Sequence, residues 1–239
     1  MKNKKQLSFV IMKRELKSYF SGPIAYIVSG LFLIITGIVF FSTFFIQGRA
    51  ELRSFFSLMP LLLSFFVPAL SMRVFSEEKR NGSYETLLTL PVTEFQVVIG
   101  KFLAVFIEVL IMFIPTLFYI VTAAIFGKPD YGPIIGGYIG LIFLSACFSS
   151  IGIFASSITK NQIISFFTAW LICIALTMID TFLIFLPSSI VSFISYLSAS
   201  SHFTSISKGI IDTRDLLYFI SLTALFITLT VKANKVSKE

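Results

Sequence analysis

Apolar residues occur along this chain in long blocks, and short polar segments separate the blocks. Six blocks are near the roughly 20 residues that a helix needs to cross a bilayer. They predict spans at Ile24–Ile46, Phe55–Val74, Phe95–Phe126, Pro133–Ile158, Ile163–Leu186 and Leu216–Val231. The third block is too long for one straight crossing, so we expect Pro115 to kink it and its first turns to stand in the cytoplasm.

Two further segments mix apolar and polar residues. Residues 6–20 predict an amphipathic helix along the membrane surface, with a floppy basic tail as the alternative. Its apolar positions recur at helical spacing between basic residues: Phe9, Met12, Leu16 and Tyr19. Residues 187–215 are Ser-rich and too interrupted to span. They predict one or two short helices at the outer interface, or a re-entrant segment that packs within the protein or lines a cavity.

Composition agrees with lipid as the solvent. Apolar residues make up 56% of the 239 residues and charged residues 13%, about half the charged fraction of a soluble protein. We therefore expect an all-α integral membrane protein with a single transmembrane domain over residues 1–239. The net charge of +7 comes from basic residues at the edges of apolar blocks, which indicates topology and not a nucleic-acid surface. Cys147 and Cys173 lie inside apolar blocks, where we expect buried small side chains.

The basic residues also predict the orientation. With the N-terminus inside, fourteen Lys and Arg lie on one side of the membrane and five on the other. The five are Arg49, Arg53, Lys128, Lys208 and Arg214. Because basic residues favour the cytoplasmic side, we expect both termini, and residues 75–94, in the cytoplasm of a cell with this chain in its inner membrane.

Residues 75–94 join two spans and combine charges with a short apolar patch. Asn81-Gly82 predicts a turn, after which Ser83 can cap a helix that Pro91 stops. The predicted helix consists of Ser83, Tyr84, Glu85, Thr86, Leu87, Leu88, Thr89 and Leu90, with its leucines on one side. Thr93, with Gln96 three residues on, has capping-box spacing and starts the next helix. A two-turn helix is not stable alone, so it packs either on its own chain or on a partner.

The stretch "EEKRNGSYETLLTLPVTEFQVVIGKFLA" resembles the signature loop of type 2 ABC transporter permeases. The stretch "HFTSISKGIIDTRDLLYF" (residues 202–219) resembles the segment before the last span in the gliding-motility GldF branch of that family, with Lys208 where Arg is expected. The resemblance implies that residues 83–90 are a coupling helix seated in a groove of an ATPase subunit. It also implies that the amphipathic start is an elbow-like connector helix, and that residues 187–212 are an outer re-entrant pair.

No nucleotide-binding motif occurs in this chain, because both Gly-Lys pairs lack the first glycine of a P-loop. We therefore expect ATP and Mg on a separate ATPase chain, and no cofactor here. The charges before the predicted helix would orient that chain more than they add affinity, and a solvated helix end is their alternative interpretation. These charges are Glu77, Glu78, Lys79 and Arg80.

Other candidate residues are few. Glu108 falls near the middle of the third span, where an ionisable group is costly. It is either functional, as a latch, dimer contact or part of a pathway, or structural. Asp180 lies near the outer end of the fifth span. His202 is the only histidine and has no Cys, His or acid cluster around it in the sequence, so we expect no metal site.

Three functions remain to be weighed. The first is the permease subunit of an ATP-driven transporter, an exporter, in which two six-span subunits, as a homodimer or with a related permease, meet two ATPase subunits. The second is a membrane scaffold or mechanical transducer driven by an ATPase. The third, an intramembrane enzyme, lacks paired acids or a nucleophile elbow, so we do not expect catalysis in this chain.

Overall fold

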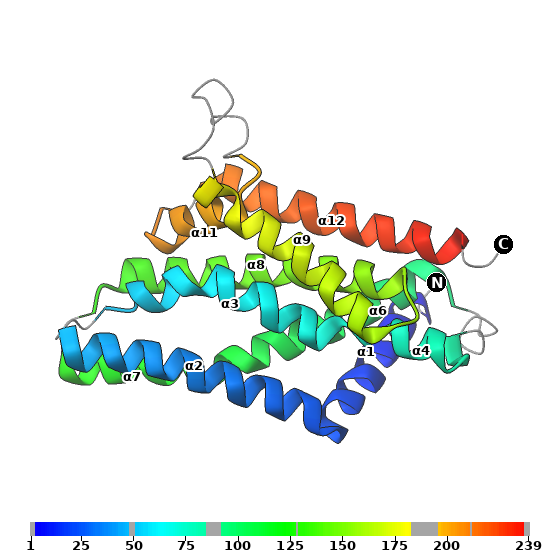
Figure 1. Cartoon of the computed structure of the whole chain (residues 1–239), viewed down its shortest axis with the longest axis horizontal. Helices are drawn as coiled ribbons and strands as arrows, with labels where there is room; N and C mark the ends of the chain where they lie inside the picture. Colours follow the sequence, from blue (N-terminus) through cyan, green and yellow to red (C-terminus); the bar gives the residue numbers. More distant parts are fainter. Residues whose placement is uncertain are drawn as a thin grey trace.

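The computed structural model describes residues 3–47, 51–84, 92–127, 129–182, 196–210 and 212–236, which form helices, turns and connections without a strand. Six helical segments are long and apolar enough to cross a membrane, which confirms the predicted all-α class. Figure 1 shows the start of α1 and the end of α12 beside α4 at one end of the bundle, and α11 at the other. We call these the α1 end and the α11 end.

The helices agree with the predicted spans to within a few residues at their ends. They are α2 (Pro23–Gln47), α3 (Arg53–Ser71), α6 (Glu94–Phe113), α7 (Leu117–Phe126), α8 (Tyr131–Ser157), α9 (Gln162–Phe182) and α12 (Thr213–Val236). The predicted kink at Pro115 is confirmed, because a 3-10 turn, η1 (Ile114–Thr116), separates α6 from α7. The predicted end of the fifth span, beyond Phe182, lies outside the described residues.

The centre of the bundle is made by α3, α6 and α8, whose apolar stretches are mostly buried, whereas only a minority of the residues in those of α2, α9 and α12 are buried. Glycines on α8 allow its neighbours to approach closely. A Cβ atom on Gly152 would lie 1.9 Å from the Ser71 hydroxyl oxygen of α3, and one on Gly137 would lie 2.4 Å from the Phe56 ring. Small residues at such contacts are typical of membrane helices, because lipid gives no hydrophobic force to hold helices together. The exposed spans present apolar faces to lipid or to another subunit.

The N-terminal helix α1 (Asn3–Ser21) crosses the α1 end and packs on α6. The carbonyl oxygen of Ser8 lies only 2.8 Å from where a Cβ on Gly100 would be. The helix itself is confirmed, and the placement of its apolar face along the membrane surface stays a prediction. Tyr19 is buried and its hydroxyl donates to the Leu70 carbonyl at 2.8 Å, whereas Phe9 is 60% exposed. Ile11, not Phe9, faces the protein, because α1 turns one stripe toward α6 and another outward.

The short helix α11 (Ala199–Ser207) lies at the α11 end and packs on α8, α9 and α12. Phe203 and Ile206 are buried against the glycine face of α8 at Gly136 and Gly140. The first part of the predicted re-entrant segment, residues 187–195, lies outside the described residues. The remainder confirms a short helix that packs within the protein.

His202 and Asp180 both fasten α11 to neighbouring spans. His202 Nδ1 lies 2.6 Å from Asp215 Oδ1 of α12, and its Nε2 lies 3.1 Å from the Tyr196 carbonyl oxygen. Asp180 of α9 accepts a hydrogen bond from Ser201 at 2.9 Å. Both side chains therefore have structural partners in this chain.

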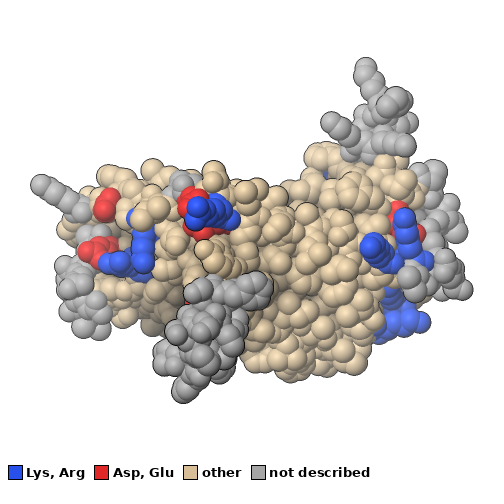
Figure 2. All heavy atoms as spheres, turned by 90° about the horizontal axis from the view of Figure 1, so that it is seen from above, with Lys and Arg blue, Asp and Glu red and all other residues tan. Residues whose placement is uncertain are grey.

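On the face shown in Figure 2, charged side chains gather toward the two ends of the molecule. Figure 2 shows Lys, Arg, Asp and Glu near both ends of the face in view, with a broad uncharged stretch between them. This distribution is what a bilayer requires, because its core solvates apolar surface and excludes charge.

Candidate functional site

The connection from α3 to α6 begins with a tightly held turn. After Ser71 the chain turns into the short helix α4 (Ser76–Arg80). The Ser156 hydroxyl oxygen of α8 accepts from the amides of Phe75, at 2.9 Å, and Ser76, at 3.1 Å, and it donates to the Met72 carbonyl at 3.0 Å. One side chain of α8 thus satisfies three backbone groups of the turn, so the base of this connection is fixed to the central span.

The predicted turn at Asn81-Gly82 is confirmed, since Gly82 has a φ of 71°, which glycine adopts without strain. Ser83 and Tyr84 then begin a helix, and the Ser83 hydroxyl donates to the Glu78 carbonyl at 3.4 Å. Burial, with the nearby charges of Glu94 and Glu78, raises the pKa of Tyr84 to about 12.

The rest of the predicted coupling helix, Glu85, Thr86, Leu87, Leu88, Thr89 and Leu90, lies outside the described residues. Its contacts therefore stay a prediction. The chain is described again from Val92, and the predicted capping box is confirmed. The Thr93 hydroxyl accepts from the Gln96 amide at 3.4 Å, and the Gln96 side chain accepts from the Thr93 amide at 3.0 Å.

The side chain of Lys101 on α6 is fully buried beneath this connection. Its ammonium nitrogen lies 2.9 Å from Glu78 Oε1, 3.2 Å from Glu15 Oε1 and 2.8 Å from the Val74 carbonyl oxygen. The ammonium group donates hydrogen bonds to Glu15 and to the Val74 carbonyl, and Glu78 is its second ion-pair partner. The Phe75 ring, 5.0 Å from the nitrogen, covers the group further. Such pairing is what allows a charge to remain in a buried position.

Arg14 on α1 completes a four-residue charge cluster. Its guanidinium lies 2.7 Å from Glu15 and 3.0 Å from Glu78. We call Arg14, Glu15, Glu78 and Lys101 the charge cluster; its two cations and two carboxylates balance. Burial opposes ionisation of Glu15, but Lys101 and Arg14 outweigh it and hold the pKa of Glu15 below its ordinary value. The cluster joins α1, α4 and α6.

The cluster makes α4 a rigid extension of the bundle. Breaking a buried ion pair by displacing one partner costs several kcal/mol, on the order of 3–5, because the other charge is left uncompensated. A push on the segment after α4 would therefore move α1 and α6 before it separated α4 from them.

The four predicted rim charges fall into two groups. Glu78 belongs to the charge cluster, and Lys79 donates to the Ser157 carbonyl and lies 5.2 Å from the centre of the Tyr84 ring. Glu77 and Arg80 form no ion pair within the part of the chain that the structure describes. These two remain available to a partner, and a role for any of the four in docking stays a prediction.

Glu108 of α6 is buried, and its Oε2 atom has no hydrogen-bond partner among the described residues. It follows Lys101 by seven residues, which is about 10 Å along the helix axis. The Arg73 guanidinium, which lies 4.8 Å from the centre of the Tyr19 ring, is near enough for its charge to act on Glu108. Glu108 is the fifteenth residue of the 33-residue apolar segment Glu94–Phe126, which confirms its predicted place near the middle of the third span.

Sequence reasoning missed Glu15 and the burial of Lys101. One signal was available, because Glu15 lies midway between Ile11 and Tyr19 at a spacing of four residues, which is one face of a helix. That stripe is the one that α1 buries against α6. An acid on a buried stripe requires a cation, and Lys101 supplies it.

A comparison with known families gives one match. A family model described as "ABC-2 family transporter protein" matches residues 9–238, which is nearly the whole chain. The matched range includes α1 from Phe9 onward, all six spans and the charge cluster. A search of curated proteins finds no match.

Proposed function

This chain belongs to the ABC-2 family of transporter membrane proteins, and we propose that it is the permease subunit of an ATP-driven exporter. Members of this family are transport subunits without catalytic activity, and they work with ABC ATPase subunits in the membrane. A separate ATPase chain, which binds ATP and Mg, docks on residues 83–90 and drives the spans through the charge cluster.

The observation that carries this proposal is the burial of Lys101 between Glu15 and Glu78. A loop that only connected two spans would not need its first helix anchored to α1 and α6 by a desolvated ion network, which is expensive to form. A loop that transmits force does need it, because a flexible joint would absorb the movement. The charge cluster stands directly before the segment where docking is proposed.

The orientation and assembly belong to the same proposal. The α1 end faces the cytoplasm of a cell with this chain in its inner membrane, which the fourteen-to-five distribution of basic residues supports. Two permease subunits, identical or related, meet through the exposed apolar spans. We also retain the gliding-motility GldF branch as the finer assignment; it rests on the sequence of residues 202–219 alone.

The test is a pair of matched double substitutions in the docking segment. The full chain is co-expressed with the ABC ATPases of its own cell, one at a time, and purified through a tag on the permease. Leu87→Asp with Leu88→Asp is expected to abolish co-purification and stimulated ATP hydrolysis, because the apolar face is lost. Thr86→Asp with Thr89→Asp adds the same charge to the other helical face and is expected to retain both.

Insertion of each variant is checked by gel filtration of the fluorescently tagged chain. Retention of an ATPase by the Leu87 and Leu88 double variant, at the level of the native chain, would rule out docking at residues 83–90. Equal loss in both double variants would show that charge alone disrupts the segment and would also contradict the assigned face.

A further inference from the structure

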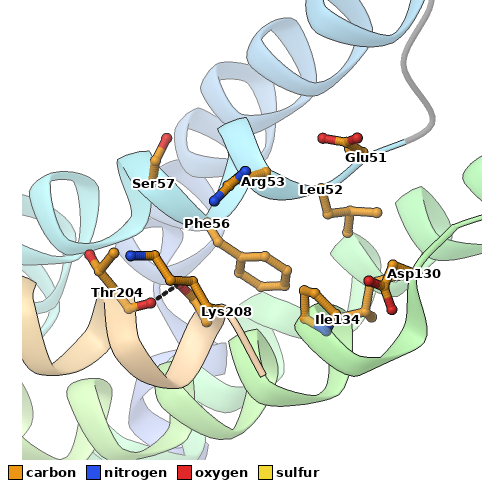
Figure 3. A pocket seen from close by; sticks show the side chains of 11 residues that line it. Glu51, Leu52, Arg53, Phe56, Ser57, Asp130, Ile134, Thr204 and Lys208 are labelled. Atoms are coloured by element: carbon orange, nitrogen blue, oxygen red, sulfur yellow. Dashed lines mark hydrogen bonds between the residues drawn. The ribbon is translucent and has the colours of Figure 1, made fainter. Parts of the chain in front are cut away.

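A pocket opens at the α11 end, opposite the charge cluster. Its volume is about 330 Å³, and it lies between the start of α3, the start of α8 and the end of α11, as Figure 3 shows. Its lining includes four charged residues and two large apolar residues: Glu51, Arg53, Asp130 and Lys208, with Phe56 and Ile134. This volume is at the lower end of the range of about 300–1,000 Å³ that small-molecule pockets have. It therefore fits a headgroup-sized molecule or part of a larger one.

The base of the pocket is apolar and built by the core. Phe56 and Ile134 are buried, and Leu52 beside them is 3% exposed. Phe56 is fixed because its ring lies against Gly137 of α8, where any side chain would overlap it. The base is therefore preformed, and it offers apolar contact to carbon atoms of a ligand.

Two cations line one side of the pocket without an ion-pair partner among the described residues. Arg53 begins α3 and Lys208 follows α11, and neither forms an ion pair with another described residue. Figure 3 shows both charged groups on the same side of Phe56, with the Thr204 and Ser57 side chains near them. A guanidinium, an ammonium and hydroxyls on one wall are the groups that bind a phosphate oxyanion.

The opposite part of the lining is acidic. Asp130, at the start of α8, is held in place because its Oδ1 accepts from the Gly132 amide at 3.2 Å. Glu51 precedes α3 and is exposed. Two acids and two bases give the lining no net charge, so it would not attract a ligand that carries only negative charge. It suits a molecule that carries both signs.

We propose that this pocket binds the headgroup of a zwitterionic phospholipid from the adjacent leaflet. The phosphodiester lies between Arg53 and Lys208, the ammonium group lies toward Asp130 and Glu51, and the first carbons of the glycerol lie on Phe56. The acyl chains stay in the bilayer, because the pocket has no room for them. This inference goes beyond the proposed export function and does not depend on which side of the membrane the α11 end faces.

The test measures binding to the full chain purified in dodecyl maltoside. Phosphatidylethanolamine is expected to be retained in native mass spectra and to raise the melting temperature more than phosphatidylglycerol does. Arg53→Gln with Lys208→Gln is expected to weaken phosphatidylethanolamine binding about tenfold or more, because two charge-assisted contacts are lost. Lys160→Gln with Lys232→Gln removes the same charge from exposed residues outside the pocket and is expected to leave binding unchanged.

Two further experiments test whether the acidic residues cause the lipid selectivity and whether the ligand is a membrane lipid or a free headgroup ester. Glu51→Gln with Asp130→Asn is expected to bring the affinity for phosphatidylethanolamine close to that for phosphatidylglycerol, while the introduced asparagine side chain keeps the helix cap. Glycerophosphoethanolamine, which has no acyl chains, is expected to compete weakly. Equal affinity of the native chain for both lipids, unchanged binding in the Arg53 and Lys208 double variant, or tight binding of the chain-free ester would each overturn the proposal.

Discussion

The two ends of the bundle carry charged side chains in opposite ways. At the α1 end, Lys101 is fully buried and contacts Glu15 of α1, Glu78 of α4 and the Val74 carbonyl of the turn before α4. At the α11 end, Arg53 and Lys208 are exposed around a pocket and form no ion pair with the described residues. The cations at both ends lie on or next to helices that pack against α8, namely α6, α3 and α11.

This difference follows from whether water can reach each cation. A buried cation is tolerated only when its partners are placed correctly, so it fixes the helices that supply those partners. An exposed cation is solvated by water, contributes on the order of 0–1 kcal/mol to stability, and keeps its donors free. The α1 end is therefore built to hold its own helices together, and the α11 end leaves charge for a ligand.

The same substitution at the two ends tests most directly whether the buried and the exposed lysine contribute differently to stability. Lys101→Met removes the fully buried centre of the charge cluster and leaves the partly buried Glu15 and Glu78 beside Arg14 alone, so we expect a loss of about 3–5 kcal/mol in stability. Lys208→Met removes an exposed charge, so we expect a change within about 0.5 kcal/mol. Thermal unfolding of the two purified variants in the same detergent measures both. Similar losses at the two positions would show that the cluster is no more structural than the pocket rim.

Two glycines allow a test of how tightly α11 packs on α8 at one end and α1 packs on α6 at the other. A Cβ on Gly136 would lie 2.3 Å from the Ile206 carbonyl oxygen, and one on Gly100 would lie 2.8 Å from that of Ser8. Both contacts are with backbone, which cannot rotate away, so each alanine costs about 1–3 kcal/mol and the cost is greater at Gly136. Hydrogen exchange is expected to rise in α11 for Gly136→Ala and in α1 for Gly100→Ala. An increase in hydrogen exchange at the opposite end in either variant would show that the effect of the substitution is not local.

The pH dependence of the α1 end gives a smaller effect. The pKa of Glu15 lies below its ordinary value in the folded protein, so its ionised form stabilises the fold above the ordinary value of 4.5. That stability is lost as the pH falls below this value through the folded pKa. Glu15→Gln is expected to cost about 1.5 kcal/mol at pH 7, and the difference from the native chain is expected to shrink in unfolding curves recorded at successively lower pH. A difference that stays constant would exclude the Lys101 and Arg14 charges as its source.

Local features of the fold were predicted correctly because neighbouring residues determine them. Pro115 removes a backbone donor and interrupts its own helix, Gly82 adopts a positive φ, and Thr93 with Gln96 closes a capping box. The spans were predicted because twenty apolar residues in succession need lipid whatever they pack against.

The charge cluster and the pocket were not predicted, because each depends on residues far apart in the chain. Lys101 beside an apolar block has the pattern of a charge at the membrane surface, and one of the two acids that pair with it in the buried position, Glu15 of α1, lies 86 residues away. The burial of Ile11 was not predicted for the same reason, since it depends on the close approach of α1 to Gly100 of α6. Arg53 and Lys208 meet at one pocket only because α11 folds back onto α8.

Glu108 resembles neither the buried, paired Lys101 nor the exposed, unpaired Arg53 and Lys208, because among the described residues it is buried and unpaired. Its carboxyl group forms no ion pair with the described residues, and Oε2 has no hydrogen-bond partner there. A charge in that position would be expensive, so the neutral acid is the form that such a site tolerates. Glutamine has nearly the same shape and the same capacity to donate and accept.

We therefore expect Glu108→Gln to have the smallest effect, below about 1 kcal/mol in stability. The variant is expected to assemble with the ATPase and to stimulate its activity like the native chain. Glu108→Leu, which removes the polar group but keeps the volume, separates a hydrogen-bonding role from a packing role by its melting temperature. Transport coupled to ATP hydrolysis in reconstituted vesicles decides between structure and function. If Glu108→Gln assembled normally and hydrolysed ATP but no longer transported, the acid would belong to the transport cycle and not only to the packing of its span.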